Sequence, residues 1–83
     1  MSTLDLKIVT PDGVQFSQEV ESATIPTSSG QITVLPKHSP LVSELKQGKL
    51  LVRTGNKVDE FDITSGVLEV RRSGAVIILT DSV

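Results

Sequence analysis

The stretch Ile25–Leu41, with the sequence IPTSSGQITVLPKHSPL, constrains its backbone more tightly than any other part of the chain. It holds three of the four prolines and the only histidine, His38. Proline fixes its own φ and pushes the preceding residue toward extended conformations, and Gly30 can take a positive φ at the tip of a turn. Between these points, residues 31–35 alternate as a short strand does, with Ile32 and Val34 on one face. We therefore predict a strand between two stiff turns.

Similar short segments, separated by turn-forming residues, make up the rest of the chain. Residues 4–8 (LDLKI) alternate apolar and polar side chains, which is typical of a half-buried strand. Residues 41–45 are apolar at both ends and fit either one helical turn or a strand. Turn signals recur every 8–12 residues, the spacing typical of a sandwich. We predict one all-β domain over residues 1–83, a two-sheet β-sandwich of about eight to ten short strands.

The second half of the chain allows two finer predictions. Gly55-Asn56 separates two strand-like segments, and a two-residue loop with glycine first favours a type II′ hairpin turn. In the segment after this turn, Val58, Phe61 and Ile63 do not all have the same parity. A strand places alternate residues on opposite faces, so this pattern predicts a bulge near Glu60.

Composition excludes several classes of function. The chain has 83 residues, a formal net charge of −2, no cysteine and no apolar run long enough to span a bilayer. A net negative charge argues against a nucleic-acid partner, which normally requires a basic face. Phe16 and Phe61 are the only aromatic residues, so a platform for stacking bases or sugars is also missing. The absence of cysteine excludes disulfides and thiolate metal sites.

Catalytic and ligand-binding motifs are weak. His38 is the only histidine and no Gly-x-Ser-x-Gly pattern occurs, so we expect His38 to be a turn residue that hydrogen-bonds nearby backbone rather than the base of a small hydrolase. Gly48-Lys49 lacks the other residues of a phosphate-binding loop. The acidic run at residues 59–62 offers at most two carboxylates, Glu60 and Asp62, on one strand face. We expect neither enzymatic activity nor a cofactor or metal site.

Residues 30–41 carry a resemblance to a known family. The sequence GQITVLPKHSPL is similar to the motif Gly-Glu/Gln-Leu/Ile-Gly-Ile/Val-Leu/Tyr-Pro-Gly-His-Ala-Pro-Leu of the epsilon subunit of the F-type ATP synthase, called delta in mitochondria. Residues 6–13, 45–50, 65–70 and 75–81 resemble the same family in the same order. The resemblance covers essentially the whole chain.

The resemblance implies a two-sheet β-sandwich and a non-catalytic place in the rotor stalk, where the domain binds the gamma subunit on one side and the c-ring on the other. It also implies a peripheral position at the cytoplasmic face of the energy-transducing membrane, reached only through the complex. Carried over by position, the residues facing the c-ring are Thr27, Ser28, Ser29, Gly30, Gln31 and, nearby, His38. Those facing gamma are Thr10, Val42 and Ser43.

The chain departs from the family pattern in three respects. Thr33 and Lys37 stand where the family has glycine, and Gln31 stands at an often acidic position. The family usually continues into an α-helical hairpin that can inhibit ATP hydrolysis, whereas this sequence ends at Val83. We therefore expect a domain that couples gamma to the c-ring but does not itself inhibit hydrolysis. The alternative is a stand-alone β-sandwich protein-binding module unrelated to the rotor.

Overall fold

The computed structural model describes residues 3–83, which form nine strands and no helix, and so no helix able to cross a membrane. This confirms the predicted all-β class and the predicted number of strands. Residues 41–45, which the sequence left open, are a strand. The strands are β1 (Leu4–Thr10), β2 (Gly13–Val20), β3 (Ser22–Thr27), β4 (Gly30–Val34), β5 (Leu41–Leu45), β6 (Gly48–Thr54), β7 (Lys57–Ile63), β8 (Gly66–Val70) and β9 (Ala75–Thr80).

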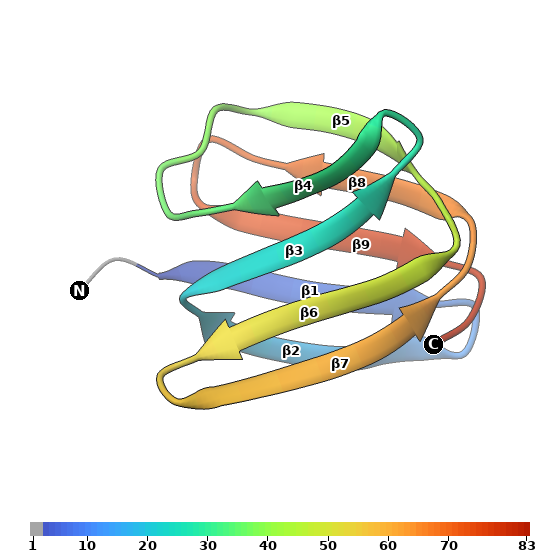
Figure 1. The fold of residues 1–83 in the computed structure, drawn as a ribbon, viewed down its shortest axis with the longest axis horizontal. Coiled ribbons are helices and arrows are strands. Elements are labelled where there is room, and N and C mark those ends of the chain that lie inside the picture. Colours follow the sequence, from blue (N-terminus) through green and yellow to red (C-terminus); the bar gives the residue numbers. More distant parts are fainter. Residues whose placement is uncertain (1–2) are drawn as a thin grey trace.

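The strands form two layers that are joined at one corner (Figure 1). The long layer has the order β2-β1-β9-β8-β5, and the short layer has the order β4-β3-β6-β7. Thr27 of β3 lies opposite Leu45 of β5, and the backbone N–H of Ser28 donates to the carbonyl of Glu44 over 3.0 Å. The predicted two-sheet sandwich is confirmed, and its two sheets are parts of one curled, continuously hydrogen-bonded sheet.

Strict alternation of side chains builds the core between the layers. In β1, Leu4, Leu6 and Ile8 are at most 1% exposed, whereas the residues between them point outward. Ile8 pairs with Ile78 of β9, and Ile78 pairs with Leu68 of β8, so three fully buried side chains lie in one row across the long layer. Because a strand turns alternate residues to opposite faces, each apolar residue in these rows faces the other layer.

The two phenylalanines close the side of the sandwich opposite the joined corner. Here β2 and β7, the last strands of the two layers, lie next to each other without pairing (Figure 1). The Phe16 and Phe61 rings pack edge to face, with centroids 5.1 Å apart and an interplanar angle of 67°. Such aromatic pairs contribute about 0.5–1.5 kcal/mol beyond the area that they bury.

The hairpin prediction at Gly55-Asn56 is confirmed, but the predicted bulge near Glu60 is wrong. Gly55 has φ 62°. Asn56 does not have a positive φ, because among the described residues Lys37 is the only one besides glycines that does. A positive φ at the first turn residue alone is the requirement of a type II′ turn. The β6–β7 register runs without interruption from the turn to Ile63. Val58 differs in parity from Phe61 and Ile63 because it is an apolar residue on the outer face, where it is 56% exposed. The register shift lies instead between β1 and β2, at Ile8 and Val9.

Candidate functional site

The connections between strands gather at two opposite ends of the sandwich (Figure 1). We call the end that carries residues 10–13 and 27–30 the twin-turn end, and the end that carries residues 35–40 and 71–74 the loop end. A single row of paired residues runs across the twin-turn end, from Thr27 through Leu45 and Gly66 to Thr80. The predicted site residues are divided between these two ends.

The two turns of the twin-turn end are built in the same way. The Thr10 hydroxyl accepts the backbone N–H of Asp12 and the Thr27 hydroxyl accepts that of Ser29, each over 3.2 Å. Each hydroxyl also donates to the carbonyl of the glycine three residues on, and these glycines have φ 114° and 115°. The residues Thr10 and Thr27 are 9% and 2% exposed. A buried threonine hydroxyl therefore holds each turn in one shape, with its two middle residues in solvent.

The hydrogen bonds of Thr27 predict a measurable effect. Thr27→Val keeps the shape of the side chain but removes the hydroxyl, so the N–H of Ser29 loses its partner. We expect a loss of about 1–2 kcal/mol in the free energy of unfolding, measured by urea denaturation. Thr33→Val, on the exposed face of the same hairpin, is the control and should change stability by about 0.5 kcal/mol at most. Equal losses in the two variants would mean that the hydroxyl does not hold the turn.

The residues predicted to face the c-ring do not all lie at the same end of the sandwich. Ser28, Ser29, Gly30 and Gln31 are exposed at the twin-turn end, whereas the side chain of Thr27 is turned inward and supports them. The structure overturns the expectation that His38 lies near them. His38 is at the loop end, because the whole of β4 runs between, a length of roughly 16 Å for five residues.

His38 is a turn residue, as the sequence predicted. Its backbone N–H donates to the carbonyl of Leu35 over 3.1 Å, and its Nδ1 lies 2.7 Å from the carbonyl oxygen of Ser39. The ring is half-buried in the loop between the two strands β4 and β5. These contacts use the polar atoms of His38 to hold the loop, where proline on both sides already restricts the backbone.

The three residues predicted to face gamma do not form one surface. Val42 points outward from β5 and is 69% exposed, while its neighbour Ser43 is half-buried and points toward the core. Thr10 also points inward, and it lies at the twin-turn end with the residues predicted to face the c-ring. Alternation along the strands explains the division, since adjacent residues lie on opposite faces. Val42 alone presents its side chain to a partner.

Sequence reasoning missed a group of side chains beside Val42. A hollow of about 500 Å³ lies at the loop end, and Arg71 and Arg72 line it together with Val42 and Pro40. The pairing of Leu41 with Val70 brings these segments together, although about 30 residues separate them in the chain. Nothing in the sequence around Arg71-Arg72 indicates that the two arginines lie beside residues 40–42. The replacement of a family glycine by Lys37 was the signal that could have drawn attention to this loop.

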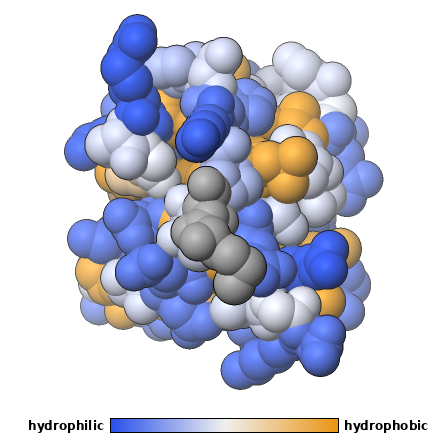
Figure 2. Space-filling model, turned by 90° about the vertical axis from the view of Figure 1, so that its left-hand side faces the viewer, coloured by the Kyte–Doolittle hydropathy of each residue, from blue (hydrophilic) through white to orange (hydrophobic). Residues whose placement is uncertain are grey.

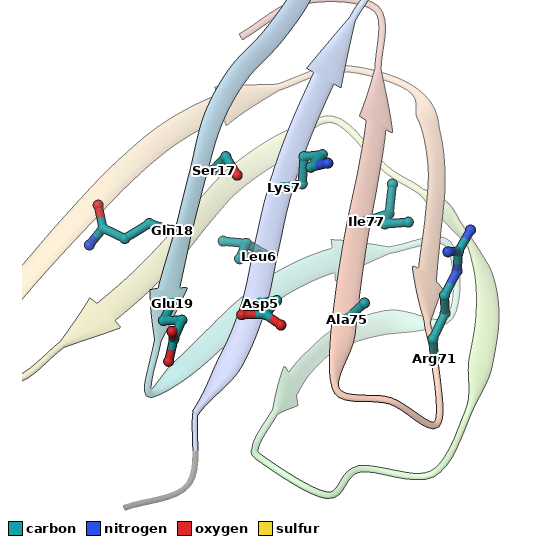
Figure 3. A pocket seen from close by; sticks show the side chains of 9 residues that line it. All are labelled: Asp5, Leu6, Lys7, Ser17, Gln18, Glu19, Arg71, Ala75 and Ile77. Atoms are coloured by element: carbon teal, nitrogen blue, oxygen red, sulfur yellow. The ribbon is translucent and has the colours of Figure 1, made fainter.

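A second hollow lies on the outer face of the long layer (Figure 3). Its volume is about 450 Å³, and none of the predicted site residues lines it. Asp5 and Glu19 sit directly opposite each other across β1 and β2, and the hydroxyl of Thr3 donates to Glu19 over 2.8 Å. Lys7 and Ile77, which are paired neighbours, continue the surface toward β9. Among residues 3–83, no three metal-ligating side chains come together here or elsewhere.

The acidic run on β7 is occupied by ion pairs. Lys49 of β6 lies between Asp62 at 3.1 Å and Glu60 at 3.7 Å, which confirms that these two carboxylates share a face. Asp59 points to the other face and pairs with Lys57 at 3.8 Å. The hydrogen bond and negative charge of Asp62, followed by the charge of Glu60, raise the pKa of Lys49 above its ordinary value. Charges along this edge strand also discourage pairing with other sheets.

The comparison with protein families covers the whole described structure. Residues 3–83 match the family described as ATP synthase, Delta/Epsilon chain, beta-sandwich domain. The chain belongs to this family. Over 80 residues it is 39% identical to an ATP synthase epsilon chain from Desulforamulus reducens and 38% identical to one from Hydrogenovibrio crunogenus. Each alignment covers 96% of this chain, and 60% and 55% of the two relatives.

Chains in two solved structures of mitochondrial ATP synthases share the fold. One chain of the cryo-EM structure of the Euglena gracilis mitochondrial ATP synthase (OSCP/F1/c-ring in rotational state 1) superposes with a TM-score of 0.90 at 30% identity. The match covers 96% of this chain and 51% of the Euglena chain. A chain of the Tetrahymena thermophila mitochondrial ATP synthase central stalk and c-ring has a TM-score of 0.81 at 18% identity, which concerns the fold alone. This chain thus spans about half to 60% of its relatives' length.

Proposed function

We propose that this chain is a non-catalytic central-stalk subunit of an F-type ATP synthase, where it binds gamma and the c-ring and helps to couple proton flow to ATP synthesis. The observation that carries the proposal is the match of residues 3–83 to the delta/epsilon β-sandwich, with a TM-score of 0.90 to a chain of an F1/c-ring assembly. In this role the domain reaches the cytoplasmic face of the membrane only through its partners.

The twin-turn end has the character expected of a contact with polar loops of the c-ring. Ser28, Ser29, Gly30 and Gln31 are exposed, small or uncharged, and carried by a turn that a buried hydroxyl holds in place. Such a turn presents backbone and side-chain polar groups without first losing conformational entropy, which favours binding by a rigid surface. Pro11 and Asp12 of the matching turn extend the same end.

In this proposal, gamma contacts the outer face of the domain at the loop end. Val42 is 69% exposed, the highest value among the large apolar side chains of residues 3–83. A partner that covers it gains apolar contact, and the surrounding charged residues provide a polar rim, as in most protein interfaces. The two proposed contacts lie at opposite ends, as a subunit bridging two partners requires (Figure 1).

Site-specific cross-linking tests the proposal, because the chain has no cysteine to interfere. Ser29→Cys, labelled with a photoreactive maleimide, should cross-link to the c subunit when the chain is assembled with gamma and the c-ring. Asn56→Cys is the matched control, since Asn56 is an exposed turn residue on the β6–β7 hairpin, at the end of the sandwich away from the twin turns. A rotor complex that incorporates neither variant, or one that cross-links equally from both positions, would contradict the proposal.

A further inference from the structure

The loop end carries a cluster of cations beside Val42. We call Lys37, Arg71 and Arg72 the basic patch. Arg71 and Arg72 line the hollow of about 500 Å³ with Val42, and Lys37 lies three residues before Pro40, which lines it as well. Three residues of chain reach at most roughly 11 Å, so Lys37 belongs to the same region. Figure 2 looks onto this end, which is mostly hydrophilic with separate apolar patches.

The backbone of Lys37 is unusual. Its φ is 68°, and no other residue among 3–83 apart from glycines has a positive φ. Glycine adopts this left-handed conformation freely, whereas the Cβ of other residues makes it unfavourable. A lysine at this position therefore works against the stability of the loop. Residues held in such conformations concentrate at functional sites, where the strain is retained for what the side chain does.

The charges of the basic patch are largely uncompensated. Glu69 binds Arg71, with Oε1 3.0 Å from Nη2. Neither Lys37 nor Arg72 makes an ion pair with any of residues 3–83. The chain as a whole has a formal net charge of −2, so the three cations of the basic patch are opposite in sign to the net charge of the protein. Free cations around an exposed apolar residue attract an acidic partner and orient it as it approaches.

We propose that the basic patch, with Val42, binds an acidic segment of the gamma subunit. The inference rests on the proposed stalk function and adds the chemistry of the contact. An acidic segment laid over Val42 buries an exposed side chain and meets Lys37 and Arg72, the two residues of the basic patch that make no ion pair with residues 3–83. The same contact explains why a lysine occupies a position whose backbone suits glycine.

The test titrates the 83-residue chain against the gamma subunit of the same source at low and at moderate salt. Arg72→Glu should weaken binding about tenfold at low salt and reduce its salt dependence. Lys46→Glu is the matched control, because Lys46 is exposed beside the twin turns and the change in net charge is identical. We expect its affinity to stay within about twofold of the unchanged chain.

Lys37→Gly separates binding from stability. Glycine adopts the backbone conformation of Lys37 without strain, so the substitution should raise the Tm by ~3 °C. The affinity for gamma should fall about fivefold, because the ammonium group is lost. A loop lysine without a binding role would change the Tm alone. Vesicles containing anionic phosphatidylserine are the third arm, and they should bind the unchanged chain far more weakly than gamma does.

Each result has one meaning. If the unchanged chain does not bind gamma, the proposed function fails and the basic patch with it. If the chain binds gamma but Arg72→Glu and Lys37→Gly bind as well as Lys46→Glu, the stalk function stands and the inference is overturned. Tighter binding to anionic vesicles than to gamma, lost in Arg72→Glu, would also overturn it by assigning the patch to a lipid surface.

Discussion

Gly66→Ala should destabilise the domain by about 3–5 kcal/mol, although the substitution removes no interaction. Gly66 opens β8 with φ 155°, and a Cβ at this position would overlap the carbonyl oxygen of Leu79 and lie 2.9 Å from the Cα of Thr80. These are backbone atoms of the paired strand β9, which cannot move aside as a side chain can. A domain of this size is stable by only about 4–12 kcal/mol, so the variant should be partly unfolded at moderate temperature.

Gly74→Ala is the control for Gly66→Ala, and urea denaturation at 25 °C is the measurement. Gly74 also has a positive φ, 97°, but the nearest atom to its added Cβ is the carbonyl oxygen of Thr3 at 4.0 Å. It therefore reports the backbone strain without the collision, and we expect a loss of about 1–2 kcal/mol. If the two variants lose the same stability, β8 and β9 separate at Gly66 more easily than the structure indicates.

Ile78→Ala should cost about 3–4 kcal/mol through a different mechanism, the opening of a cavity. Ile78 is fully buried in β9 between Ile8 of β1 and Leu68 of β8, in the middle of the long layer. Strands on both sides hold their positions by hydrogen bonds, so the surroundings have little freedom to collapse into the space. The free energy of unfolding should therefore include both the lost burial and the cavity.

Ile78→Val removes one methylene and provides the comparison, with an expected loss of about 1 kcal/mol. Both variants should keep the same dependence of stability on urea concentration, since unfolding exposes the same surface area in each. A loss below about 1.5 kcal/mol for Ile78→Ala would show that the two layers close over the gap. That result would also mean that the joined corner at Thr27 and Leu45 does not hold the layers apart.

Local patterns in the sequence predicted the strands well, and they failed where a pattern had two possible causes. Alternation of apolar and polar residues identified β1 and β4, because a half-buried strand must turn every second side chain inward. The break of parity at Val58 was attributed to a bulge, but Val58 is simply an exposed apolar residue. Apolar side chains are common on protein surfaces, so parity alone does not distinguish the two cases.

Candidate site residues were predicted less well, because position along the chain does not give position in space. His38 follows the 27–31 turn by only seven residues, yet a complete strand carries it to the opposite end. Thr10 and Thr27 are far apart in the sequence and play the same part in matching turns. Val42 and Arg72 become neighbours only when β5 pairs with β8.

The sequence by itself determined the all-β class, the approximate number of strands, the turn at Gly55-Asn56 and the membership of the delta/epsilon family. These depend on periodicity, on glycine and proline and on motifs, all of which act over a few residues. Only the tertiary structure determined which turns share an end, which side of a strand Val42 and Ser43 face, and which cations gather at the loop end. The physical reason is that pairing between distant strands, such as β1 with β9, is selected by burial of the whole core rather than by either segment alone.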